Sequence, residues 1–98
     1  MRYSRFAMNE IMPKDVVLSV SGRDKGRIFA VIDVDEKYVY ICDGKERPLS
    51  RPKRKNRRHV SPTRHCVESE AFRGNKALKK ALSQISINLE ERSSGTDS

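Results

Sequence analysis

The stretch 27-RIFAVIDVDEKYVYIC-42 predicts a β-hairpin at the centre of the fold. Residues 27–34 and 38–42 alternate apolar side chains and are rich in β-branched and aromatic residues, as strands are. The polar residues 35–37 between them are few enough for a hairpin turn. We expect the core face of this hairpin to carry Ile28, Ala30, Ile32, Val34, Val39 and Ile41. The opposite face then carries Phe29, Val31, Tyr38, Tyr40 and Cys42.

A further strand and a glycine-flanked loop precede this hairpin. The residues 16-VVLSV-20 are β-like, and the six residues 21-SGRDKG-26 connect them to the hairpin. Gly22 and Gly26 can adopt positive φ at low cost, as a tight connection between strands requires. Because a strand and not a helix follows, and no Gly-Lys-Ser/Thr is present, this loop is not a P-loop.

More short strands are predicted after the hairpin. Asp43-Gly44 marks a turn, and strands are expected near residues 46–49 and near residues 57–60, with Pro62 ending the last one. The chain thus has five short β segments with no helix between them. Such a pattern predicts a small barrel or curled sheet, because closure removes exposed edges.

The pattern changes beyond Pro62, where an amphipathic helix is predicted over residues 75–92. Apolar residues recur there at intervals of three and four, at Leu78, Leu82, Ile85 and Leu89. Asn75 can cap the start of this helix. We expect the helix to pack on a bed formed by Phe29, Val31, Tyr38 and Tyr40, although the two tyrosines could instead stack unpaired bases.

Length and composition fit one small folded unit with polar extensions. The chain has 98 residues, of which 36% are hydrophobic and 35% charged. We divide it into an N-terminal extension (1–13), a barrel (14–63), a linker with the helix (64–92) and a disordered tail (93–98). Two cysteines without paired spacing, no secretory pattern and no long apolar run predict a reduced, cytoplasmic protein.

Positive charge is concentrated in one part of the chain. The net charge is +8, and residues 45–58 hold eight basic residues against the single acid Glu46. Cations gathered in this way favour a polyanionic partner, because each Lys or Arg on a phosphate releases a counterion. The run 51-RPKRKNRR-58 is also compatible with a nuclear import signal or a solvated tail. Its position between predicted strands favours contact with an RNA backbone.

The order of these pieces resembles the bacterial KOW-domain proteins, which are related to a large-subunit ribosomal protein family of archaea and eukaryotes. The resemblance rests on VVLS at 16–19, GRDKGR at 22–27, YVYICDG at 38–44 and RPKRKNRRHVSPT at 51–63. The start of the helix, NKALKKAL at 75–82, is similar to that of many members. The resemblance implies an SH3-like barrel that binds RNA, with ribosomal RNA or the ribosome as the partner.

The candidate RNA contacts are the basic residues and the glycine loop. In the basic run and directly after it they are Arg51, Lys53, Arg54, Lys55, Arg57, Arg58 and His59. Supporting contacts are expected from Arg23, Lys25, Gly26, Arg27, Lys45 and Arg47. The family resemblance implies contact at the glycine loop, where a backbone without β-carbons allows phosphates to approach closely.

A different class of function stays open beside RNA binding. The barrel or the helix could bind a protein of a transcription or translation complex, with the basic run in a secondary role. We expect no enzyme, no cofactor and no metal. The histidines and cysteines lack ligand spacing, and Asp33, Asp35 and Glu36 lie at a hairpin tip where carboxylates are ordinarily solvated.

Overall fold

The computed structural model describes the backbone of residues 11–96 and the side chains of residues 11–89. The elements are, in order, β1 (Asp15–Ser19), β2 (Ile28–Val34), β3 (Tyr38–Cys42), β4 (Lys53–Asn56), the 3-10 helix η1 (Arg57–His59), β5 (Val60–Cys66), the 3-10 helix η2 (Ser69–Arg73) and α1 (Asn75–Thr96). The predicted class, a mainly β domain with five short strands and a C-terminal helix, is confirmed.

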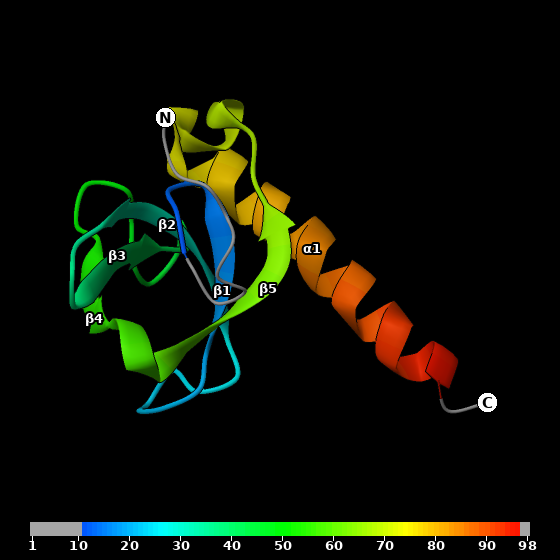
Figure 1. Ribbon diagram of the computed structural model, residues 1–98. Helices are drawn as coiled ribbons and strands as arrows, with labels where there is room; N and C mark the ends of the chain where they lie inside the picture. The colour runs from blue at the N-terminus through cyan, green and yellow to red at the C-terminus, as the bar shows by residue number, and fades with distance from the viewer. Residues whose placement is uncertain (1–10, 97–98) are drawn as a thin grey trace.

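The five strands form one antiparallel sheet in the order β4-β3-β2-β1-β5. The strands β4 and β5 lie at opposite edges of this order, yet only the three residues of η1 connect them along the chain. Such a short connection requires the sheet to curl until its edges approach each other, as Figure 1 shows. The curled sheet is the barrel-like form that the five short strands predicted.

The pairing of β2 with β3 corrects the predicted core face. Ala30 lies opposite Cys42, and Val31 lies opposite Ile41. Directly opposed residues of neighbouring strands share a face. Ile41 therefore lies with Val31 and Phe29, and not with Ala30 as predicted. The prediction placed β3 one residue out of register, and a shift of one residue exchanges the two faces of a strand.

Both faces of the sheet bury apolar side chains. The face inside the curl holds an interior cluster formed by Ile11, Val17, Phe29, Val31, Val39, Ile41 and Val60. The outer face holds a helix-side cluster formed by Val16, Ala30, Cys42, Val67, Ala71, Leu78, Leu82 and Ile85. Ile11 shows that the interior reaches into the predicted N-terminal extension, of which residues 1–10 lie outside the described part of the chain.

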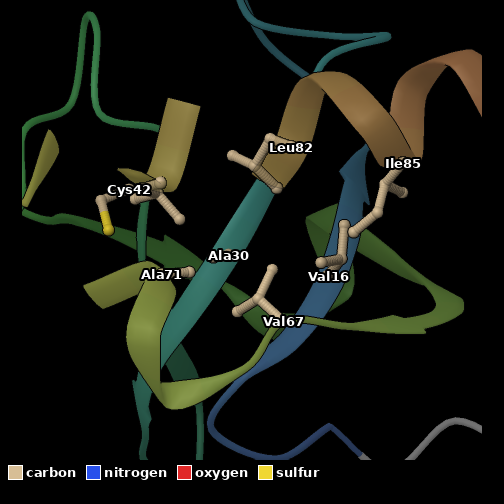
Figure 2. Close-up of a cluster of buried hydrophobic side chains, with 8 residues drawn as sticks. Val16, Ala30, Cys42, Val67, Ala71, Leu82 and Ile85 are labelled. Atoms are coloured by element: carbon tan, nitrogen blue, oxygen red, sulfur yellow. The ribbon is translucent and has the colours of Figure 1, made fainter. Parts of the chain in front are cut away.

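The helix α1 covers the outer face of the sheet through its predicted apolar stripe. Figure 2 shows Leu82 and Ile85 facing Val16 and Ala30. Burying an aliphatic side chain of this kind contributes about 1.5–3 kcal/mol to folding. The predicted bed of Phe29, Val31, Tyr38 and Tyr40 is wrong, because the first two lie in the interior cluster and the tyrosines belong to neither cluster.

The bounds of α1 also differ from the prediction. The helix begins at Asn75 as expected, but it continues to Thr96 and so includes residues 93–96 of the predicted tail. Residues 97–98 lie outside the described part of the chain. The Asn75 side chain accepts a hydrogen bond from Leu49 N at 2.7 Å and thereby ties the connection between β3 and β4 to the helix start. No helix within residues 11–96 is long and apolar enough to cross a membrane.

The strand predicted near residues 46–49 does not form. Asp43 Oδ1 accepts hydrogen bonds from Lys45 N and Arg47 N, both at 2.9 Å, and so folds these residues into a turn. Gly44 has a φ of 79°, which suits the turn and not a strand.

The predicted strand at residues 57–60 is replaced by two other elements. The fourth strand is β4, inside the basic run, and Asn56 then caps η1 by accepting a hydrogen bond from Arg58 N at 2.8 Å. The fifth strand begins at Val60 and continues through Pro62 to Cys66. Proline is tolerated there because β5 is an edge strand and its register with β1 shifts at this place.

Candidate nucleic-acid interface

Two glycines set the shape of the loop between β1 and β2. Gly22 has a φ of 88° and Gly26 a φ of 91°, so the predicted positive φ is confirmed at both positions. Gly26 N donates a hydrogen bond to Ser19 O at 2.8 Å and closes the loop on the end of β1. Arg23 and Lys25 are exposed at the tip of this loop.

Asp24, between these two cations, ties the loop to β4. Its Oδ1 accepts hydrogen bonds from Ser19 Oγ and Lys55 Nζ, both at 2.7 Å, and its Oδ2 lies 3.2 Å from Lys53 Nζ. Lys55 Nζ also donates to Ser21 O at 2.8 Å. The Lys55 and Asp24 side chains are only 7% and 11% exposed. The loop and the basic strand are therefore held side by side.

The ionisation of Asp24 follows from these contacts. Burial removes water from the carboxyl and by itself raises the pKa of Asp24. Hydrogen bonds from Lys55, Ser19 and Lys53, together with the positive charge of Lys55, outweigh burial and hold this pKa well below its ordinary value. The carboxylate thus stays charged at neutral pH and neutralises part of the basic run from within.

Alternation along β4 separates the cations of the basic run. Lys53 and Lys55 lie opposite Ile41 and Val39, whose side chains are in the interior cluster. Both lysines therefore extend to Asp24, and Lys55 is buried. Arg54, between them, is exposed on the other face. Of the expected phosphate contacts, Lys55 is thus buried within the fold, whereas Arg54 is accessible to a ligand.

The remaining residues of the basic run, and His59 after it, also divide into exposed side chains and one that is held by the fold. Arg51, Arg58 and His59 are exposed, and among residues 11–89 no acidic side chain forms an ion pair with them. Arg57 is half-buried, and its Nη1 donates to Asp35 O at 3.0 Å, which binds η1 to the β2–β3 hairpin.

A second basic group lies beside the start of α1. Arg27 forms ion pairs with Asp43 at 3.2 Å and with Glu46 at 2.7 Å, so this predicted contact is already neutralised by two acids. Lys45 and Arg47 are exposed in the same turn, where the described acids form no ion pair with them. The turn is held by Asp43, a buried residue.

A hollow lies where the β2–β3 hairpin meets the end of β4. It is lined by Glu36, Lys37, Tyr38, Asn56, Arg57 and Arg58. Arg54 stands over the Tyr38 ring with its Cζ atom 4.5 Å from the ring centroid. This is the distance of a cation–π contact. The hollow therefore combines an aromatic ring with several cations at one end of the basic run.

The part that three residues play in organising this surface was not predicted from the sequence, although Asp43 was correctly placed in a turn. Asp24 and Asp43 fix the cations around them, and Asn56 both caps η1 and lines the hollow. A signal for Asp24 is present, since it is the acid in the basic loop 21–26, and buried lysines need such a partner. The alternation of residues 53–56 could likewise have shown that only part of the run faces outward.

The two cysteines lie in different environments. Cys42 is buried in the helix-side cluster, and Cys66 is exposed at the end of β5. Burial, with the charge of Asp43, raises the pKa of the Cys42 thiol to about 11. Within the described part of the chain, no three His, Cys, Asp or Glu side chains lie close enough together to hold a metal ion.

Fold and site together define a small β domain with a C-terminal helix and outward-facing cations on its loops and one edge strand. No protein-family model matches the chain. It is 38% identical over 68 residues to the large ribosomal subunit protein eL14 of Pyrobaculum calidifontis, and equally similar to that of Pyrobaculum neutrophilum. Each match covers 68% of this chain and 66% of the relative, a little under two thirds of its length. The chain is homologous to archaeal eL14 proteins, which links it to a ribosomal-protein family.

Proposed function

We propose that this protein is a ribosomal-protein-like RNA-binding protein of the cytoplasm, without enzymatic activity, that contacts ribosomal RNA or the ribosome. The observation that carries the proposal is the separation of paired and unpaired cations. Lys53, Lys55 and Arg27 form ion pairs with acids of the fold, whereas other cations of the same segments are exposed. The homology to eL14 proteins and the resemblance of residues 16–63 to KOW-domain proteins support the same function.

The proposed phosphate contacts are the exposed cations of three neighbouring segments. They are Arg23 and Lys25 in the glycine loop, Lys45 and Arg47 in the β3–β4 turn, and Arg51, Arg54, Arg58 and His59 in the basic run. Gly26 adds an exposed backbone without a β-carbon. Lys53 and Arg57 assist from half-buried positions, while Lys55 and Arg27 act by fixing the loops.

Such an interface reads the phosphate backbone more than the base sequence, because Arg and Lys contacts to phosphates carry no sequence information. Binding is therefore expected to weaken steeply as salt rises. This dependence separates the proposal from the alternative, a module whose barrel or helix binds a protein of a transcription or translation complex, with the basic run in a secondary role.

Sedimentation tests the proposal. A lysate that contains the tagged protein is run on sucrose gradients at low salt, at high salt and after mild nuclease treatment. Co-migration with ribosomal particles at low salt, and release by high salt or nuclease, is the expected result. Migration as free protein at low salt would contradict the proposal, whereas co-migration with ribosomal particles that resists both treatments would identify a permanent component of the particle.

A further inference from the structure

The hollow at the hairpin tip is built from two segments that the backbone locks together. Tyr38 of β3 is paired with Asn56 of β4, and Arg57 N donates to Lys37 O at 2.9 Å. Arg57 Nη1 adds a hydrogen bond to Asp35 O at 3.0 Å. The walls of the hollow are therefore set before any ligand arrives, which lowers the cost of binding.

The polar groups around the hollow offer both donors and an acceptor. Lys37 and Arg58 are exposed cations. The Asn56 Oδ1 atom is occupied by Arg58 N at 2.8 Å, so its amide nitrogen is the part left to donate. The exposed carboxylate of Glu36 accepts hydrogen bonds. A plain anion would be repelled by Glu36, whereas a nucleotide has a phosphate for the cations and base donors for the carboxylate.

The side chain of Tyr38, which lines the hollow, is not part of the hydrophobic core. Tyr38 is half-buried and belongs to neither hydrophobic cluster. Arg54 stands over the Tyr38 ring but does not line the hollow, whereas Tyr38 does. A partly exposed aromatic side chain thus borders the hollow, and RNA-binding sheets commonly stack unpaired bases on such rings.

We infer that this hollow takes one unpaired nucleotide of RNA, with its base against Tyr38 and its phosphate at Lys37 and Arg58. The inference rests on the RNA-binding function proposed above and adds to it a site that distinguishes single-stranded from paired RNA. In a duplex the bases are stacked on each other and unavailable to the ring. The cations of the remaining surface, in contrast, bind the phosphate backbone of single-stranded and of paired RNA.

The test uses the full chain and two RNA hairpins that differ in one bulged 2-aminopurine. Tyr38→Leu removes the flat ring, Tyr38→Phe keeps it, and Tyr40→Leu is the matched control. Tyr40 is also half-buried and lies two residues after Tyr38, on the same face of β3, but it does not line the hollow. Affinity is measured by fluorescence anisotropy and base stacking by 2-aminopurine quenching, with the melting temperature of each variant recorded.

The parent protein is expected to quench the bulged base and to bind the bulged RNA more tightly than the paired one. Tyr38→Leu should lose about 5- to 150-fold in affinity for the bulged RNA, the range that loss of base–aromatic stacking produces. Its affinity for the paired RNA should stay unchanged, and Tyr38→Phe and Tyr40→Leu should bind both RNAs as the parent does.

Several results would overturn the inference. If the parent binds both RNAs equally and leaves the bulged base unquenched, the hollow takes no nucleotide, while RNA binding itself still stands. The same conclusion follows if Tyr38→Leu behaves like Tyr40→Leu. If Tyr38→Leu fails to fold, the quenching by the parent and by Tyr38→Phe decides the question. If the parent binds neither RNA, the proposed function fails together with the inference.

Discussion

Lys55 and Asp24 form a shielded ion pair, 2.7 Å between Nζ and Oδ1, that joins the basic strand β4 to the loop between β1 and β2. Because of this contact, Lys55 and its neighbour Arg54 have different roles in the basic run. Lys55 is part of the fold, whereas Arg54 faces outward. Breaking a buried ion pair by removing one partner costs more stability than removing an exposed charge.

Lys55→Met is therefore expected to lower the free energy of unfolding by about 3 kcal/mol, since it removes the most buried cation from the shielded Asp24 carboxylate and leaves only the half-buried Lys53 as its ion-pair partner. Arg58→Met is the matched control, because Arg58 is exposed and belongs to the same run. It should change the free energy of unfolding by less than about 0.5 kcal/mol. Urea unfolding monitored by circular dichroism measures both variants. Equal effects of the two changes would show that Lys55 is not part of the fold.

Acid should destabilise the protein through Asp24. Its pKa is lowered in the folded state from the ordinary value of 3.8, so its contribution to stability is present above that pH and is lost as the pH falls below it. The free energy of unfolding, measured from pH 7 to pH 2, should therefore decline more steeply below about pH 4 in the parent than in Asp24→Asn. Parallel pH profiles would contradict this assignment.

Gly44 should tolerate substitution less well than Gly26. Both have positive φ, 79° and 91°, where any β-carbon brings strain. A β-carbon at Gly26 meets nothing within 4 Å, whereas one at Gly44 collides with the backbone of Asn75 at the start of α1. Gly26→Ala is expected to cost about 1–2 kcal/mol, and Gly44→Ala clearly more, as measured by thermal unfolding. A smaller loss for Gly44→Ala would mean that this contact is absent in solution.

The two cysteines should react at very different rates. Cys66 is exposed, whereas Cys42 is buried and its pKa is raised to about 11, which keeps it in the unreactive thiol form. A colourimetric thiol reagent at pH 8 should modify one thiol per chain rapidly and the second only in denaturant. Cys66→Ser should abolish the rapid phase. Two rapid phases in the parent would contradict the packing of α1 over Cys42.

The hairpin and the helix could be predicted from the sequence because their apolar periodicity is regular. The register of β3 could not, because the pairing of β2 with β3 shifts between Val31 and Asp33. Alternation alone identifies which residues share a strand face but not which neighbouring face they join. The end of β5 was misplaced because Pro62 reads as a strand terminator unless the strand is known to be an edge.

The candidate interface was predictable only at the level of charge. A run of cations indicates an anionic partner, but the pairing of Lys55 and Lys53 with Asp24 depends on a contact between segments about 30 residues apart. The acid in the basic loop 21–26 indicates that Asp24 pairs with a cation, but the sequence does not show that its partners are Lys53 and Lys55. The hollow at Tyr38 likewise arises from the pairing of β3 with β4, and the prediction had placed no strand at residues 53–56.

The salt dependence of RNA affinity is the most direct test of the proposed interface. The outward variant replaces Arg51, Arg54 and Arg58 with Gln, and the control variant removes three exposed cations elsewhere, at Arg73, Lys76 and Lys80. With about four to six phosphates neutralised on single-stranded RNA, log K against log salt should fall with a slope near −3 to −4 in the parent and the control. The slope of the outward variant should be shallower by about 2. A slope that is the same in all three proteins, or an affinity that does not depend on salt, would contradict RNA binding through this surface.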